Sequence, residues 1–192
     1  MDLSEINFAV LVASLIVAST PLVLAALGEL IVEKAGVLNL GVEGMMIIGA
    51  VAGFIVGVET GSAYIGMIAA AVAGALLSLL FAFIILIMQA NQVASGLALT
   101  IFGLGIAALM GHPYTGIKSP QISTISIPIL SEIPILGTMF FQHDLIVYLS
   151  LISVLTIWYF LTRMRAGLIL RSVGEDHDLS LIHISEPTRP IR

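Results

Sequence analysis

The chain has 192 residues, of which 59% are hydrophobic and only 10% are charged, and its mean hydropathy is +1.13. A soluble domain carries about 25% charged residues, so this chain cannot bury its apolar surface in one water-soluble core and belongs in a bilayer. The net charge of -5 forms no basic patch, which argues against nucleic acid as a partner. The absence of cysteine excludes disulfides and thiolate metal sites.

Long apolar runs predict the membrane-spanning helices. Residues 1–7 lack the positive start of a cleavable signal peptide, so Phe8 begins a retained helix. Each run is long enough to cross a ~30 Å hydrocarbon core with some tilt. The sequence therefore predicts an all-α integral membrane protein, a polytopic helical bundle with about five transmembrane helices in this fragment. We expect the spans at about 8–27 (with Pro21 inside), 38–58, 63–88, 93–110 and 145–161.

A polar, glycine-rich stretch lies between the first two runs, at residues 28–44. Charge at membrane depth is costly and usually faces a bundle interior or an aqueous path, and glycines favour a break or close packing. We therefore expect a broken helix near residues 28–44, which favours a transporter over a membrane anchor. The candidate substrate-pathway or gating residues of this stretch are Glu29, Glu33, Asn39 and Glu43.

These side chains have competing interpretations. Glu29 and Glu33 share a face if the helix persists, and Glu33 can be neutralised by Lys34. A structural or gating role for these carboxylates is favoured over substrate contact. The Asn39 amide either binds ligand, as broken transporter helices do, or caps a half-helix, and the sequence leaves both open.

A second polar cluster, Gln89, Asn91, Gln92 and Ser95, separates the third and fourth runs. Carboxamides offer both a donor and an acceptor, which suits uncharged polyhydroxyl or nucleobase ligands. Asn91 and Gln92 are therefore further pathway candidates. The alternative is a polar turn with Ser95 as the helix cap.

Glycines recur every fourth residue along the second run, at Gly49, Gly53, Gly57 and Gly61. Small residues at this spacing line one helix face and allow a neighbouring helix to approach closely. We interpret Gly49, Gly53 and Gly57 as helix-packing residues.

The stretch 112–144 contains Pro113, Pro120, Pro128 and Pro134, too many for a straight helix. We expect an external loop with a short re-entrant or interfacial piece around 125–141; a piece that spanned would reverse the topology. The isolated histidines at either end of the loop are a weak metal signal, and no metal site is predicted.

Basic residues set the orientation. Arg163, Arg165 and Arg171 follow the fifth run, which predicts that this end is cytoplasmic. Five crossings then place the N-terminus outside and Lys34 inside.

Four blocks have a recognisable order and spacing: Gly28-Glu29-Leu30 through Glu43-Gly44-Met45-Met46, then Ala90-Asn91-Gln92-Val93-Ala94-Ser95-Gly96-Leu97-Ala98-Leu99, then Gln142-His143-Asp144, then Arg165-Ala166-Gly167-Leu168 with Arg171-Ser172-Val173-Gly174-Glu175. Together they resemble the permease subunit of bacterial ABC importers for nucleosides and simple sugars, within the branched-chain amino acid and ribose permease family. The resemblance covers about residues 8–175.

The resemblance implies a partner set and a location. Such a permease pairs with a second permease, is driven by a cytoplasmic ATP-binding subunit, and receives ligand from an extracytoplasmic substrate-binding lipoprotein. It is a multi-pass protein of the bacterial inner membrane. The loop that docks on the ATPase corresponds to residues 165–175, with Arg165, Gly167, Arg171, Gly174 and Glu175.

The chain has no P-loop, nucleophile elbow or His-Glu-x-x-His pair. We therefore expect a transport subunit and not an enzyme. We expect it to bind no cofactor itself, with ATP and Mg²⁺ held by the partner ATPase.

Beyond Glu175 the sequence departs from the family pattern. The run Leu179-Ser180-Leu181-Ile182-His183-Ile184-Ser185-Glu186-Pro187-Thr188-Arg189 resembles the translation of a sequencing-library adapter. We interpret residues 1–178 as the N-terminal part of an ABC permease transmembrane domain and residues 179–192 as a non-native tail. The alternative is a genuine short polar C-terminus.

Two other functions fit parts of the sequence. An intramembrane enzyme could use Glu29, Glu33 and Glu43 as acid–base groups, although no histidine or serine partner is near them in sequence and residues 165–175 would go unexplained. An ATP-independent carrier or channel is the other alternative. Neighbouring genes for an ATPase and a lipoprotein would favour the importer over both.

Overall fold

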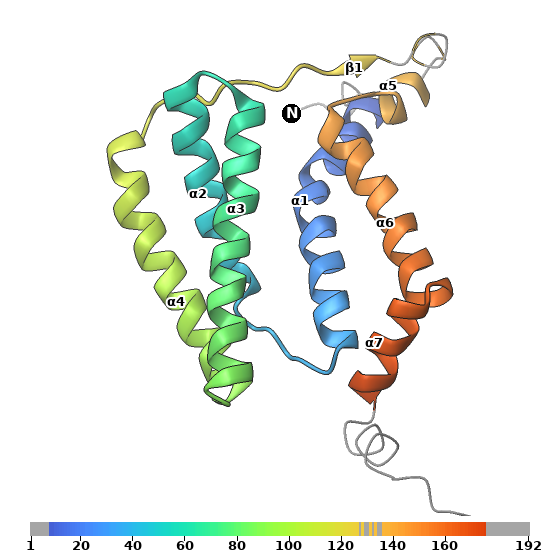
Figure 1. Cartoon of the computed structure of the whole chain (residues 1–192). Helices are drawn as coiled ribbons and strands as arrows, with labels where there is room; N and C mark the ends of the chain where they lie inside the picture. Colours follow the sequence, from blue (N-terminus) through green and yellow to red (C-terminus); the bar gives the residue numbers. More distant parts are fainter. Residues whose placement is uncertain (1–7, 127, 129–130, 132, 134–135, 176–192) are drawn as a thin grey trace, which may run out of the picture.

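The computed structural model describes residues 8–126, 128, 131, 133 and 136–175 (Figure 1). Five of its helices are long and apolar enough to cross a membrane. These helices confirm the prediction of an all-α polytopic membrane protein. The spans are α1 (Phe8–Lys34), α2 (Val42–Thr60), α3 (Ala63–Ala82) with its π-helical extension η2 (Phe83–Ile87), α4 (Gln92–Gly111) with the 3₁₀ turn η3 (His112–Tyr114), and α6 (Leu145–Arg163).

Short elements complete the described chain. The strands β1 (Ile125–Ser126) and β2 (Gln142–His143) pair antiparallel, and the helix α5 (Leu136–Phe140) lies between them. At 5 residues α5 is far shorter than the roughly 20 residues that a crossing requires. The described part of the expected interfacial piece therefore adds no crossing. The last described helix is α7 (Arg165–Glu175). Residues 179–192, predicted to be a non-native tail, lie outside the described residues.

Polar residues set the helix boundaries. The Ser62 side chain accepts a hydrogen bond from the Ile65 N–H at the start of α3, and the Asn91 side chain accepts one from the Ala94 N–H at 3.0 Å at the start of α4. The alternative in which Ser95 caps α4 is wrong, because Asn91 takes that position and Ser95 lies inside the helix. Gly61 ends α2 with a left-handed φ of 67°.

The helices form two packed groups. One group contains α2, α3 and α4, and the other contains α1, α5, α6 and α7 (Figure 1). Contacts between the groups are sparse, and residues 35–41 connect them at one end of the molecule. The main buried cluster lies in the first group, with its η2 extension, and consists of Met45, Leu77, Phe81, Ile85 and Leu99.

Glycines allow the backbones of the first group to touch. A Cβ added to Gly53 would lie 2.8 Å from the Gly66 carbonyl oxygen, and one on Gly49 would lie 3.1 Å from that of Ala70. The predicted helix-packing face thus meets α3, although at Gly57 the nearest atom is in Pro120 at 3.6 Å. Such close approach is how membrane helices gain van der Waals contact when lipid is as apolar as their side chains.

The α2–α4 contact is equally close and leads to a stability prediction. A Cβ on Gly103 would lie 2.8 Å from both Cα and the carbonyl oxygen of Gly44, whereas Gly105 on the same helix has no atom within 4 Å of that position. We expect Gly103→Ala to lower the free energy of unfolding by about 1–3 kcal/mol through overpacking. Gly105→Ala is the matched control and should not destabilise.

Denaturant titration of the chain in mixed micelles measures the difference between the two variants. Equal unfolding midpoints would show that α2 and α4 do not touch at Gly44.

Candidate functional site

The break between the first two spans is shorter than the sequence suggested. Helix α1 continues unbroken through Gly28, Glu29 and Glu33 to Lys34, and α2 begins at Val42. The interruption is therefore residues 35–41. Near its start, Gly36 takes a left-handed φ of 82°. A break within the expected stretch 28–44 is confirmed, but it is confined to residues 35–41 because the helix persists across Gly28.

Side chains from two other helices satisfy the backbone of this break. The Leu38 N–H donates to Oε1 of Gln92 at 2.8 Å, and the Thr100 hydroxyl donates to the Leu40 carbonyl oxygen at 3.0 Å, both on α4. The Asn39 N–H donates to Oε1 of Glu29 on α1 at 3.1 Å. Backbone groups that lie outside a helix in a membrane protein need such partners. The break is thus tied to both helix groups.

Asn39 supports the turn that leads into α2. Its side chain is buried, its Oδ1 accepts a hydrogen bond from the Gly41 N–H at 3.0 Å, and its amide nitrogen lies 3.7 Å from the Met45 sulfur. This geometry corresponds to the local, cap-like interpretation of Asn39, with Gly41 itself in the N-cap position. Ligand contact by the amide stays a prediction.

The carboxylates do not converge. Glu33 is exposed near the end of α1, and Glu43 is exposed in the first turn of α2, where a negative charge complements the helix dipole. Only Glu29 contacts the break. Within the part of the chain that the structure describes, Glu33 forms no ion pair with Lys34, and the single ion pair joins Arg171 to Glu175 at 3.9 Å.

Gln92 and Thr100 take part in the site through long-range contacts. From the sequence, Gln92 was a pathway candidate with a polar turn as the alternative, and Thr100 was passed over. Gly96, between them on α4, permits the contact, since a Cβ there would lie 2.9 Å from the Leu40 nitrogen. The sequence does carry a signal for these contacts. Gln92, Gly96 and Thr100 are four residues apart, so small and polar residues share one face of α4.

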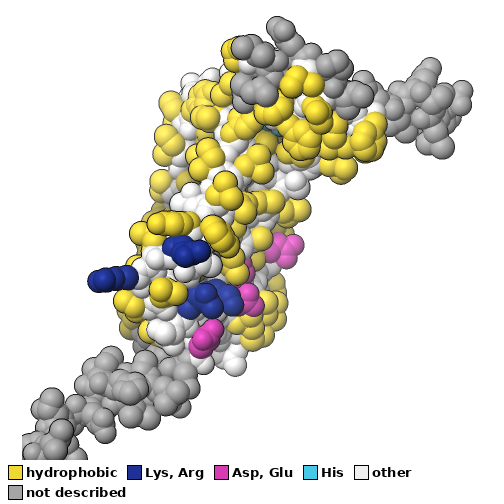
Figure 2. Space-filling model, turned by 90° about the vertical axis from the view of Figure 1, so that its right-hand side faces the viewer, with side chains coloured by type: hydrophobic (Ala, Val, Ile, Leu, Met, Phe, Trp, Pro, Cys, Tyr) yellow, Lys and Arg dark blue, Asp and Glu magenta, His cyan; other side chains and the backbone are white. Residues whose placement is uncertain are grey.

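Helix α7 docks against the end of α1. A Cβ on Gly174 would collide with the Lys34 carbonyl oxygen and lie 2.8 Å from the Gly36 nitrogen, and one on Gly167 would collide with the Phe160 carbonyl oxygen of α6. Both glycines therefore sit at contacts that no side chain could share. Figure 2 shows that the Lys and Arg side chains on this face gather at one end of the molecule, next to a broad apolar surface. Arg165 and Glu175 are exposed on α7.

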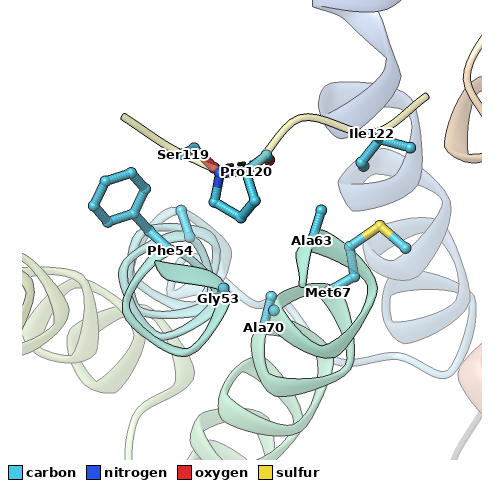
Figure 3. A pocket seen from close by; sticks show the side chains of 11 residues that line it. Gly53, Phe54, Ala63, Met67, Ala70, Ser119, Pro120 and Ile122 are labelled. Carbon is cyan, nitrogen blue, oxygen red and sulfur yellow. Dashed lines mark hydrogen bonds between the residues drawn. The ribbon is translucent and has the colours of Figure 1, made fainter. Parts of the chain in front are cut away.

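A small cavity of about 270 Å³ lies at the opposite end (Figure 3). Residues 119–122 cross over the ends of α2 and α3 there, with Pro120 and Ile122 above Phe54 and Met67. Ser119 is the only lining residue with a polar side chain. The cavity therefore offers little chemistry.

These features define the class of the protein. It is a multi-pass helical membrane protein with a hydrogen-bonded break between its first two spans and an amphipathic helix docked on that break. Residues 11–181 match the family model described as branched-chain amino acid transport system / permease component, and the chain belongs to this family.

Named relatives refine the comparison. The chain is 40% identical over 167 residues to a Haloferax volcanii protein provisionally named as a glucose ABC transporter permease, covering 85% of this chain and 51% of the relative. It is 36% identical over 190 residues to a guanosine ABC transporter permease of Bacillus subtilis, covering 91% and 58%. It is 33% identical over 178 residues to a nucleoside ABC transporter permease of Lactococcus lactis, covering 87% and 56%.

The chain thus spans slightly more than half the length of these relatives. No solved structure matches it.

The hydrogen bonds from the break to Glu29 and to Gln92 can be tested separately by mutation. Glu29→Ala should speed hydrogen exchange at the Asn39 amide, and Gln92→Ala should speed it at the Leu38 amide. Losing one hydrogen bond costs about 0.5–1.5 kcal/mol, so we expect roughly two- to tenfold effects. Glu29→Gln keeps an acceptor oxygen and is the control. Residue-resolved exchange measurements in nanodiscs test this; unchanged protection in both alanine variants would mean that these hydrogen bonds do not hold the break.

Proposed function

We propose that the chain is part of the transmembrane permease subunit of an ABC importer that translocates nucleosides or simple sugars. Family membership and the names of the relatives support the transporter class. The observation that carries the proposal is the contact of Gly174 with Lys34 and Gly36, because it joins a short amphipathic helix to the polar break.

The proposed partners follow from this assignment. They are a second permease, a cytoplasmic ATP-binding subunit that holds ATP and Mg²⁺, and an extracytoplasmic substrate-binding lipoprotein. We propose the bacterial inner membrane as the location, with the α7 end cytoplasmic. The position of Lys34 at the same end as Arg165 and Arg171 supports this orientation, since basic residues are enriched on the cytoplasmic side.

The contacts suggest a route for coupling. A rigid displacement of α7 by the ATPase would press on Gly36, which lies near the start of residues 35–41. Leu38 is bonded to α4 and Asn39 to α1, so movement of the break would pass to both helix groups. We propose Arg165, Gly167, Arg171, Gly174 and Glu175 as the coupling residues, and Glu29, Asn39 and Gln92 as the residues that respond in the membrane. We assign no direct part to Glu33, Glu43 or Asn91.

The enzyme alternative lacks support from the site. Two of its three carboxylates are exposed, and Glu29 accepts a backbone hydrogen bond.

The carrier alternative differs from the importer in its energy source. Uptake of labelled guanosine and glucose into proteoliposomes containing the assembled complex tests it directly. Uptake that requires ATP and the lipoprotein supports the importer, and uptake without ATP contradicts it.

Gly174 gives the sharper test of coupling. We expect Gly174→Ala to reduce ATP-driven uptake roughly fivefold or more, because overpacking at this contact costs about 1–3 kcal/mol and displaces α7. Glu175→Ala should also lower uptake, since this exposed carboxylate faces the proposed ATPase partner. Basal ATP hydrolysis and ligand binding by the lipoprotein should persist in both variants.

Gly105→Ala, with open space around its Cβ, is the control and should transport normally. Normal uptake by Gly174→Ala would remove α7 from the coupling route.

A further inference from the structure

A groove runs between α1, α2 and α3, in the gap between the two helix groups. It encloses about 710 Å³. Its walls are continuous helix faces, because the lining positions recur three or four residues apart. The lining residues are Pro21, Leu24, Ala25, Gly28, Glu29 and Val32 on α1; Asn39 in the break; Val42, Met45, Met46, Gly49 and Ala50 on α2; and Ala70, Ala71, Gly74, Ala75 and Ser78 on α3.

The groove has the length and the surface of a helix-binding site. The α1 wall extends from Pro21 to Val32, which is about 17 Å at 1.5 Å per residue. Gly28 has no atom within 4 Å of its Cβ position, and the nearest to Gly74 is 3.8 Å away. These glycines differ from Gly53, whose Cβ position is already filled by α3. Small residues facing open space are typical of a surface that another helix approaches closely.

An unsatisfied carboxylate oxygen is a second, independent feature of this groove. Oε1 of Glu29 accepts the Asn39 N–H, but Oε2 is buried and has no hydrogen-bond partner among the described residues. An unpaired carboxylate at membrane depth is costly. The occupant of the groove should therefore bring a hydrogen-bond donor to the level of Glu29.

We propose that the groove receives a further membrane helix of the same permease, from the part of the relatives' length that this chain does not span. That helix presents small residues toward Gly28 and Gly74 and a donor side chain toward Oε2 of Glu29. The inference rests on family membership and not on the proposed transport activity, so the two can fail separately.

Two other occupants fit less well. A lipid chain brings no donor to Glu29. A sugar would leave hydroxyl groups unpaired. The lining offers only Glu29, Asn39 and Ser78 as polar side chains, and Asn39 is engaged by Gly41.

The chain contains no cysteine, so single nitroxide labels can be placed without background. Ala75→Cys and Gly28→Cys put labels on facing walls of the groove, and Leu76→Cys puts one on the opposite face of α3, where the side chain is 62% exposed. Collisions with oxygen and with a water-soluble nickel chelate are measured in bilayers. Two proteins are compared: this chain, and this chain extended by the remaining part of the Bacillus subtilis guanosine permease.

We expect both groove labels to lose oxygen accessibility several-fold in the extended protein without gaining nickel accessibility. The Leu76 label should stay oxygen-accessible in both proteins, which verifies insertion. Groove labels that stay oxygen-accessible would indicate lipid, and labels that become nickel-accessible would indicate an aqueous ligand path. Either result overturns the proposal.

Assembly from two polypeptides gives a second readout. The remaining part of the Bacillus subtilis guanosine permease is co-expressed with this chain as a separate polypeptide. Purification through a tag on this chain should capture it. Gly74→Leu, which fills the groove, should reduce capture roughly fivefold or more, because the added side chain overpacks the contact. Leu76→Ala, on the opposite face of α3, should not reduce it. Equal capture by Gly74→Leu and Leu76→Ala, or no capture by the unaltered chain, contradicts the proposal.

Discussion

The structure depends on how backbone polar groups are satisfied at residues 35–41, where the chain leaves helical geometry between α1 and α2. Residues 38–40 lie outside any helix, and their amides and carbonyl would each cost several kcal/mol if left unpaired in lipid. Three side chains meet this requirement: Glu29, Gln92 and Thr100. These bonds tie the segment between α1 and α2 to α1 and to α4, whereas α2 and α4 also pack directly at Gly44 and Gly103. Without them the two helix groups would share little direct contact.

Packing in this molecule uses two different means. Within the group of α2, α3 and α4, glycines bring backbone against backbone, as at Gly44 and Gly103. Between the groups, hydrogen bonds from side chains replace that contact. Gly-mediated packing is short-ranged and rigid, whereas hydrogen bonds to an extended segment allow its neighbours to shift together. A protein whose halves must move relative to each other benefits from the second kind of connection.

Hydropathy was enough to predict the five spans, because the energetic cost of placing polar residues in lipid leaves long uninterrupted runs. Helix ends were less accessible to prediction. Gly28 suggested a break, but its neighbours are residues that favour helices, so α1 continues past it. The sequence offered Ser95 as one possible cap of α4, but Asn91 has the extended backbone that a cap requires. The bond between Gln92 and Leu38 joins residues 54 positions apart, and no local pattern reports such a contact.

The long-range hydrogen bonds made by Gln92 and Thr100 also set an order of events during synthesis. Gln92 and Thr100 follow their partners by 54 and 60 residues. At about 5–20 residues per second, the ribosome delivers them roughly 3–12 seconds after residues 38–40. Helices α1 and α2 therefore exist before the groups that complete the segment between them. During that interval the Leu38 N–H and the Leu40 carbonyl must hydrogen-bond to water or to the insertion machinery, and the arrival of α4 supplies their partners.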